Sequence, residues 1–322
     1  MRVALGLFWL VLAWAMLISL DLALLKMGSY GLALFAFSPL VMGVLVGRLT
    51  PVETTGQALK WGAVSATIGC AFFLLLGLEG LLCTAMALPL AIPLGMLGSY
   101  LSLRMRKARL GLGSSALLIL PLGVAAAGYD MTAAPATYEV STSVEISASP
   151  QTVWQHVIAY SDMPEPTDWL FRSGISYPQR VRLDGEGVGA TRYCDFSTGS
   201  FVEPITVWQP GQRLEFDVVE SAAPMKEWSP YGDIQPAHLH GYFVSKKGRF
   251  VLTTLPNGHT LVNGTSWYQH GLEPAGYWRW WSDAIIHRIH LRVLHHIQQL
   301  SETADVRNRA AIHQVHPVGT GL

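Results

Sequence analysis

The chain has 322 residues, 22 basic and 22 acidic, and 50% of its positions are hydrophobic. This balance excludes a protein that binds nucleic acid through a strongly basic surface. The averages conceal two unlike parts: residues 1–130 hold 8 basic and 4 acidic residues and no histidine, whereas residues 131–322 hold all 11 histidines. The first part has the composition of a membrane region, and the second that of a water-soluble domain.

Five long apolar runs fill the first part, and each approaches the roughly 20 residues that a helix needs to cross a bilayer. The first run could be a cleaved signal peptide, but it is long and lacks a clear small-residue cleavage site, so we expect an uncleaved span. The fifth contains Pro121 and many small residues, which a membrane helix tolerates when its neighbours pack against it. The predicted spans are about Val3–Leu25, Tyr30–Val46, Trp61–Leu78, Leu81–Leu103 and Leu110–Tyr129.

The basic residues between these runs predict an orientation, because Lys and Arg stay preferentially on the cytoplasmic side. With the N-terminus inside, seven basic residues face the cytoplasm, four of them in the segment Arg104–Arg109, and only Lys26 faces outward. Glu79 then lies in a short outer turn at the membrane interface. We expect an integral protein of a bacterial-type inner membrane whose C-terminal domain is periplasmic. If the fifth run does not span, that domain is cytoplasmic.

The second part begins with a short linker, Thr132–Thr137, and then a strand, because apolar and polar residues alternate along Tyr138–Ile146. A helix follows, since Ser149 can cap its N-terminus and Pro150 suits its first turn. The proline-containing segment Met163–Trp169 ends this helix and begins a short second one.

Strand-like runs separated by glycine- and proline-rich turns come next, a pattern typical of an antiparallel sheet. A long loop, Glu220–Leu239, interrupts them, and with its Trp228 we expect it to close a cavity or to touch the outer leaflet. A long helix is predicted from Pro274 to Ser301, followed by a disordered tail after Asp305. The predicted strands are Arg180–Leu183, Thr191–Phe196, Phe201–Trp208, Arg213–Val219, Tyr242–Leu255 and Thr260–His270.

The order of these elements predicts an α+β helix-grip domain over residues 131–305, preceded by an all-α bundle of five membrane helices over residues 1–130. An open antiparallel sheet has one apolar face that must be covered, and the long C-terminal helix is the element large enough to cover it. We expect a strongly bent sheet around one helix to leave a cavity between them.

Four local sequences carry a resemblance to a known family: Val144–Trp154, Gly187–Gly189, Val207–Leu214 and Gly258–Val262. Over about residues 137–303 the chain resembles the START-like helix-grip superfamily of polyketide cyclases/dehydrases and lipid-transfer proteins. The resemblance implies a cavity for sterols, phospholipids, polyketides or hormones, and in some members cyclisation or dehydration of the ligand.

The resemblance favours a membrane-anchored domain that binds a lipid or another hydrophobic small molecule, without a cofactor and without a nucleic-acid partner. A cyclase- or dehydratase-type enzyme is the first alternative, with Glu203 and His270 as candidate catalytic residues. A membrane sensor or assembly factor is the second. The candidate ligand-binding residues are Trp208, Phe216, Tyr242, Trp267, Trp281 and Ile285.

Two groups of polar residues have alternative interpretations. Glu203 lies in an apolar strand, where a carboxyl group that faced the cavity would have a raised pKa and could act as an acid. We favour the simpler interpretation, in which it faces solvent on the outer side of the sheet. The pairs His238/His240 and His287/His290 could supply imidazole ligands, but no cysteine or carboxylate completes a known spacing, so we expect no metal site.

Overall fold

The computed structural model of the protein describes residues 14–25 and 29–315, with the backbone alone for residues 112–120 and 308–315. The chain forms two compact units. We call the first the helical unit, which comprises Met1–Pro135, Lys226–Tyr242 and His270–Arg279. We call the second the sheet unit, which comprises Ala136–Met225, Phe243–Gln269 and Trp280–Leu322.

Apolar helices make up most of the helical unit. Helix α3 begins at a capping box, because the Thr54 hydroxyl accepts from the Gln57 amide while the Gln57 side chain accepts from the Thr54 amide. Pro89 and Pro93 lie inside α4 without ending it. The helices are Trp14–Leu25, η1 (Ala33–Phe37), α2 (Ser38–Leu49), α3 (Thr55–Leu75), α4 (Leu81–Lys107) and α5 (Leu112–Thr132).

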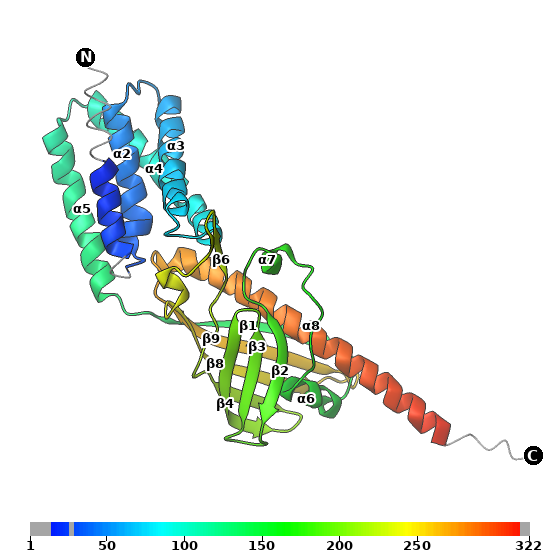
Figure 1. Ribbon diagram of the computed structural model, residues 1–322. Coiled ribbons are helices and arrows are strands. Elements are labelled where there is room, and N and C mark those ends of the chain that lie inside the picture. The colour runs from blue at the N-terminus through cyan, green and yellow to red at the C-terminus, as the bar shows by residue number, and fades with distance from the viewer. Residues whose placement is uncertain (1–13, 26–28, 316–322) are drawn as a thin grey trace, which may run out of the picture. The chain divides into compact units, whose positions relative to one another are not determined.

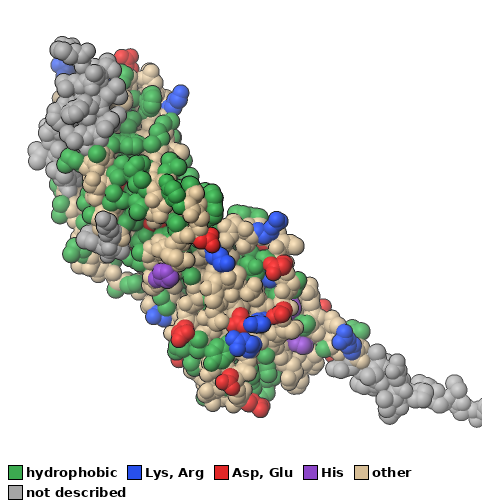
Figure 2. Space-filling model, viewed as in Figure 1, with side chains coloured by type: hydrophobic (Ala, Val, Ile, Leu, Met, Phe, Trp, Pro, Cys, Tyr) green, Lys and Arg blue, Asp and Glu red, His purple; other side chains and the backbone are tan. Residues whose placement is uncertain are grey.

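Two helices among the described residues, α3 and α4, are long and apolar enough to cross a membrane. Trp14–Leu25 and Ala33–Leu49 are apolar but shorter. The predicted count of five spans is therefore not supported, although part of the first predicted span lies outside the described residues. Hydrophobic side chains cover much of the visible face of the helical unit, as Figure 2 shows. These observations favour membrane association and leave the orientation a prediction.

Glycines allow α2, α3 and α4 to pack closely. A Cβ atom on Gly95 of α4 would lie 2.6 Å from the carbonyl oxygen of Gly62 in α3, and one on Gly43 of α2 would lie 2.0 Å from the carbonyl oxygen of Gly95. Both distances are too short for a side chain, so the backbones touch at this point. Small residues commonly permit such contacts between membrane helices.

The sheet unit is built on seven strands in the order β1-β9-β8-β5-β4-β3-β2. The pairs β1–β9, β2–β3, β3–β4, β4–β5 and β5–β8 are antiparallel, as the turn-rich sequence predicted. Every predicted strand is present, and two of them, β3 and β9, have the predicted ends. The strands are β1 (Thr137–Ile146), β2 (Pro178–Asp184), β3 (Thr191–Phe196), β4 (Gly199–Gln209), β5 (Arg213–Asp217), β8 (Phe243–Thr254) and β9 (Thr260–His270).

The predicted helices α6 (Pro150–Ile158) and α7 (Trp169–Arg172) follow β1. Ser149 caps α6, because its hydroxyl accepts from the amide of Thr152 at 3.3 Å. Asp168 caps α7 in the same way, through the amide of Leu170.

Helix α8 (Ala275–Val315) lies along one face of the sheet (Figure 1). Leu214 and Val262 of the sheet and Leu294 and Ile297 of α8 are fully buried in one hydrophobic cluster. The packed layer between sheet and helix confirms the predicted helix-grip arrangement, but at these residues the layer is filled by side chains where the sequence led us to expect a cavity. Two details differ from prediction: Ile286 is buried rather than Ile285, and α8 continues to Val315, so the tail is helical up to that residue.

The predicted loop Glu220–Leu239 contains regular structure. A hairpin of β6 (Glu227–Ser229) and β7 (Gly232–Ile234) precedes the short helix η2 (Ala237–Leu239). From Lys226 onward this segment belongs to the helical unit. The hydroxyl of Tyr231, in the hairpin turn, donates to the carbonyl oxygen of Leu75 at the end of α3 (2.7 Å).

Candidate functional site

A buried ion pair lies on the inner face of the sheet. Arg192 of β3 is directly opposite Glu203 of β4 in the antiparallel register, and its Nη1 binds Oε2 of Glu203. Arg192 is 2% exposed and Glu203 6%. The interpretation that Glu203 faces solvent is therefore wrong. Glu203 shares a face with the buried Ile205, two residues along the strand.

Aromatic rings surround the Arg192 guanidinium group. Its central carbon lies 5.0 Å from the ring centroid of Phe216 in β5 and 5.7 Å from that of Phe250 in β8. A guanidinium group stacks favourably on aromatic faces when water is excluded. Phe216, a predicted ligand-binding residue, is thus placed beside the ion pair.

Two buried donors at this position lack a strong hydrogen-bond acceptor among the described residues. They are Nε of Arg192 and the hydroxyl of Tyr160, which follows α6 and has the weakly accepting thiol of Cys194 beside it. A buried polar group without a partner costs about 1–3 kcal/mol, so such groups are uncommon and require an explanation. Here the two groups could each donate a hydrogen bond to a ligand inside an otherwise apolar layer.

Burial also sets the protonation of the neighbouring acids. Burial raises the pKa of Glu203, and the charge of Arg192 offsets this only in part. Burial raises the pKa of the Cys194 thiol to about 12, which keeps it protonated and unreactive as a nucleophile. Burial thus favours the protonated form of Glu203, and the ion pair with Arg192 favours its carboxylate form.

A second polar group joins α8 to the sheet. The Thr142 hydroxyl oxygen lies 2.7 Å from Nδ1 of His287 and 3.1 Å from Nδ1 of His290. The Ser266 hydroxyl oxygen lies 2.8 Å from Nε2 of His290. Since both ring nitrogens of His290 face hydroxyl groups, the predicted absence of a metal at the His287/His290 pair remains the simplest interpretation.

His290 predicts a pH dependence of stability. Burial, with the neighbouring His287, lowers its pKa from 6.5 to about 4. Unfolding below pH 6.5 therefore takes up a proton, and the free energy of unfolding should fall by up to about 3 kcal/mol between pH 6.5 and pH 4. Guanidinium unfolding of the full chain at several pH values measures this. His290→Gln should reduce the dependence in that interval, and an unchanged dependence would show that His290 is not its source.

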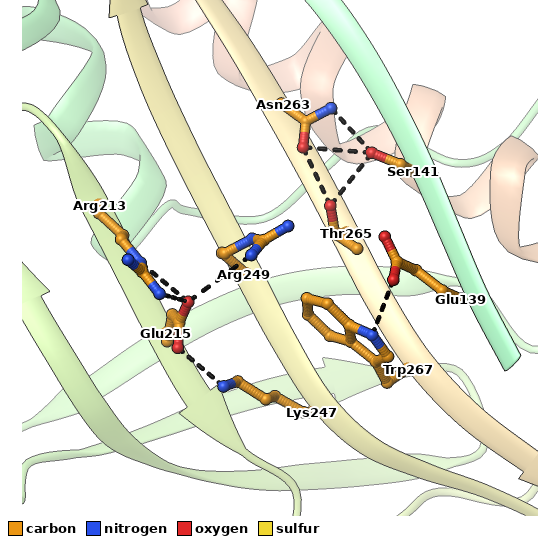
Figure 3. Close-up of polar contacts among 9 residues, drawn as sticks. All are labelled: Glu139, Ser141, Arg213, Glu215, Lys247, Arg249, Asn263, Thr265 and Trp267. Atoms are coloured by element: carbon orange, nitrogen blue, oxygen red, sulfur yellow. Dashed lines mark hydrogen bonds and ion pairs between the residues drawn. The ribbon is translucent and has the colours of Figure 1, made fainter. Parts of the chain in front are cut away.

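Trp267, predicted to line the cavity, lies on the opposite face of the sheet (Figure 3). Its Nε1 donates to Glu139 at 3.0 Å, and the guanidinium carbon of Arg249 lies 4.9 Å from its ring centroid. Beside it, Lys247 binds the buried carboxylate of Glu215 at 2.8 Å. This outer face is a network of charges, which corrects the prediction for Trp267.

The other candidates are placed as follows. Trp208 packs on the hydrophobic core with its ring centroid 5.3 Å from that of Trp154. Trp281 and Ile285 of α8 are half-buried. Tyr242 and His270 belong to the helical unit, where the ring of Tyr242 lies 5.0 Å from Tyr30, and His270 is buried. Their roles in binding or catalysis stay predictions.

Arg192 and Tyr160 were not identified as candidate site residues from the sequence. For Arg192 a signal exists, because it alternates with Cys194 and Phe196 along a strand whose apolar residues face inward. For Tyr160, which follows the short helix α6, the sequence carries no comparable pattern.

Residues 137–265 match the family described as polyketide cyclase / dehydrase and lipid transport. Together with the fold, this match shows that the segment is a helix-grip domain of the polyketide cyclase/dehydrase family, as the sequence motifs predicted. The family is consistent with hydrophobic ligand binding or cyclase-type activity. No curated protein matches the chain.

Three solved structures illustrate the similarity. The Zhui aromatase/cyclase from Streptomyces sp. R1128 is 14% identical, with a TM-score of 0.33, 57% of this chain and 99% of that chain covered. Norcoclaurine synthase from Thalictrum flavum is 8% identical, with a TM-score of 0.33 and coverages of 53% and 97%. The Aha1 dimer from Colwellia psychrerythraea is 15% identical, with a TM-score of 0.30 and coverages of 51% and 96%.

Proposed function

We propose that the sheet unit binds a lipid or another hydrophobic small molecule that carries an oxygen acceptor. The observation that supports this most is the buried Arg192–Glu203 pair with two unused donors, Arg192 Nε and the Tyr160 hydroxyl. An acceptor oxygen of the ligand would satisfy both donors and fix its orientation. Its apolar part would be bound by burial, at roughly 25 cal/mol per Å².

Access to this position requires movement. Leu214 of β5 and Leu294 of α8 are fully buried, so the layer around the ion pair is closed by side chains of the protein itself. A ligand would enter as α8 and the sheet separate locally. Elements that open for ligands are commonly among the less stable parts of a domain.

We propose further that the helical unit anchors this domain in a bacterial-type inner membrane. The turn between α3 and α4 lies at one end of this helix pair, and basic residues lie at the other end. They are Lys60 near the start of α3 and Arg104, Arg106 and Lys107 at the end of α4. The positive-inside rule therefore favours a cytoplasmic position for the basic ends and an outer position for the turn. The exposed Trp228 and Tyr231 of the adjoining hairpin suit the outer interface. We propose that α5 and the two shorter apolar helices cross as well, which would make the N-terminus cytoplasmic and the sheet unit periplasmic.

A cyclase- or dehydratase-type enzyme is a second candidate, and Glu203 favours it. A carboxyl group with a raised pKa beside a ligand can donate a proton. Glu203→Gln separates the two functions. If the protein is an enzyme, this variant should still bind the ligand but should no longer convert it to product.

A fluorescent fatty acid, cis-parinaric acid, tests ligand binding in the full chain held in lipid nanodiscs, with empty nanodiscs as the baseline. The double variant Arg192→Met/Glu203→Leu should lower the affinity at least about tenfold, because it removes a charge-assisted hydrogen bond worth about 1.5–3 kcal/mol. Lys247→Gln, on the outer face of the sheet, is the matched control and should bind as the wild type does. Equal affinities in the double variant and the wild type would refute a role of the pair.

A further inference from the structure

Three chemically different side chains meet inside the helical unit. Glu79 follows α3, Cys83 lies in the first turn of α4, and His238 lies in η2. Each residue offers one ligand atom: a carboxylate oxygen, the thiol sulfur and a ring nitrogen. These three atoms lie within 4.8 Å of one another. All three residues are buried, at 7%, 8% and 6% exposure. Carboxylate, thiolate and imidazole are the three donor types that zinc accepts.

The spacing of these atoms suits a shared metal ion. Nδ1 of His238 lies 3.2 Å from Oε2 of Glu79, and neither atom makes a hydrogen bond within the described structure. Tetrahedral zinc holds nitrogen and oxygen ligands at about 2.0–2.1 Å, which places them about 3.3 Å from each other. The two atoms are therefore already at the separation that coordination would impose.

Carboxylate and hydroxyl groups lie next to the remaining polar atoms of these ligands. Oε1 of Glu79 accepts from the Tyr30 hydroxyl at 2.7 Å, whereas Nε2 of His238 lies 3.6 Å from Oε1 of Glu227, too far for a hydrogen bond but near enough for one after a small shift. Glu227 is itself held at the N-terminus of α4, where it accepts from the amides of Leu82 and Cys83. A metal-binding histidine generally donates its other ring N–H to a carboxylate, which orients the ring and raises its basicity.

A protonated His238 between two carboxylates is the alternative explanation. Burial alone would lower its pKa, but Glu227 and Glu79 outweigh burial and raise the pKa to about 9. This explanation accounts for the two glutamates. It gives the thiol of Cys83 only a weak hydrogen bond to Glu79, although the thiol sulfur lies within 4.8 Å of both other donor atoms.

The group borders a cavity of about 70 Å³ that Tyr30, Glu79 and Cys83 line together with Asp21 and Ser38. One water needs about 10–15 Å³, so the cavity has room for water beside Glu79 and Cys83. Zinc sites with three protein ligands characteristically keep a fourth position for water or substrate.

We propose that Glu79, Cys83 and His238 bind a divalent transition metal of the zinc class, with water or a small anion as the fourth ligand. Binding displaces the thiol proton of Cys83 and, when His238 is protonated at Nδ1, the proton on that nitrogen; these protons leave to solvent, and Nε2 of His238 keeps its proton. This proposal departs from the expectation of no metal site, which rested on spacing in the sequence. The proposal concerns the helical unit alone and is independent of ligand binding in the sheet unit.

Cobalt(II) is the probe that tests it, in the full chain purified in detergent and stripped with a chelator. We expect saturation at one cobalt per chain, with thiolate-to-cobalt charge-transfer absorption and the visible bands of tetrahedral cobalt, and displacement by zinc. Cys83→Ser should abolish the charge-transfer band. Glu79→Gln and His238→Ala should weaken binding by about tenfold or more. The matched controls are Cys70→Ser and the exposed neighbour His240→Ala, which should both bind cobalt as the wild type does.

The wild-type chain alone can overturn the proposal, so it does not depend on whether the variants fold. A folded wild type that shows no saturable charge-transfer band contradicts it. A band that survives both Cys83→Ser and His238→Ala, or one that disappears in Cys70→Ser, also contradicts it, because the metal would then be bound elsewhere. Circular dichroism of each variant confirms that a lost band reflects a lost ligand.

Discussion

Replacing Arg192 with methionine should destabilise the sheet unit by about 3–5 kcal/mol. The substitution leaves the Glu203 carboxylate buried without its countercharge, and an uncompensated buried charge has a cost of this size. For a domain of this length the midpoint of thermal unfolding should fall by roughly 10 °C. Circular dichroism of the full chain, followed with temperature, measures the shift.

Two further variants test whether the unpaired charge is the cause. Arg192→Met/Glu203→Leu replaces the whole pair with apolar side chains and should recover most of the lost stability. Arg180→Met removes a half-exposed arginine that binds Asp195 on the other face of the sheet, and it should cost less than about 1 kcal/mol. If the double variant is no more stable than Arg192→Met, lost packing rather than charge explains the effect.

Gly95→Leu should disrupt the packing of α2, α3 and α4. A Cβ atom at this position would meet the backbone oxygen of Gly62 at 2.6 Å, and backbone atoms cannot rotate away as a side chain can. We expect a loss of about 3 kcal/mol or more, since overpacking at a site that cannot relax has the largest costs. The midpoint of thermal unfolding of the detergent-solubilised chain gives the comparison with the wild type.

Gly56→Ala is the matched control for this variant. Gly56 also lies in a helix, in the first turn of α3, but a Cβ atom there would have nothing within 4 Å. Alanine favours the helix over glycine by up to about 1 kcal/mol, so this variant should be as stable as the wild type or slightly more so. Equal stability of Gly95→Leu and Gly56→Ala would mean that the helices do not touch at Gly95.

The strands of the sheet unit could be predicted because each is bounded by a turn and has one buried face. The turns around β3 and β9 predicted both ends of these strands, and the alternation along Tyr138–Ile146 predicted β1 except for its first residue, Thr137. The buried face of α8 was harder to predict, because Trp281, Ile285 and Ile286 are all apolar. Helical spacing alone does not decide which of two adjacent residues faces the sheet.

The orientation of Glu203 was mispredicted for an identifiable reason. The register of β4 shifts between Ile205 and Val207, where an irregularity interrupts the alternation of faces. Trp208 and Glu203 consequently both pack toward the interior, although five positions separate them. A strict alternation of faces would place Trp208 and Glu203 on opposite sides of the sheet, and the sequence carries no clear sign of such a shift.

The group Glu79, Cys83 and His238 could not be found from sequence spacing at all. Two of its members lie at the turn between α3 and α4, and the third lies in a short helix of a distant segment. Spacing rules for metal ligands apply to neighbouring positions on one helix or loop. Only the packing of Lys226–Tyr242 into the helical unit brings the three together.

Native mass spectrometry of the full chain, released from detergent, tests ligand binding in the sheet unit most directly. We predict one copurifying lipid or other hydrophobic molecule per wild-type chain, and none in a folded Arg192→Met/Glu203→Leu variant. A wild-type chain that carries no such molecule, or a double variant that carries the same amount, would contradict binding at the buried ion pair.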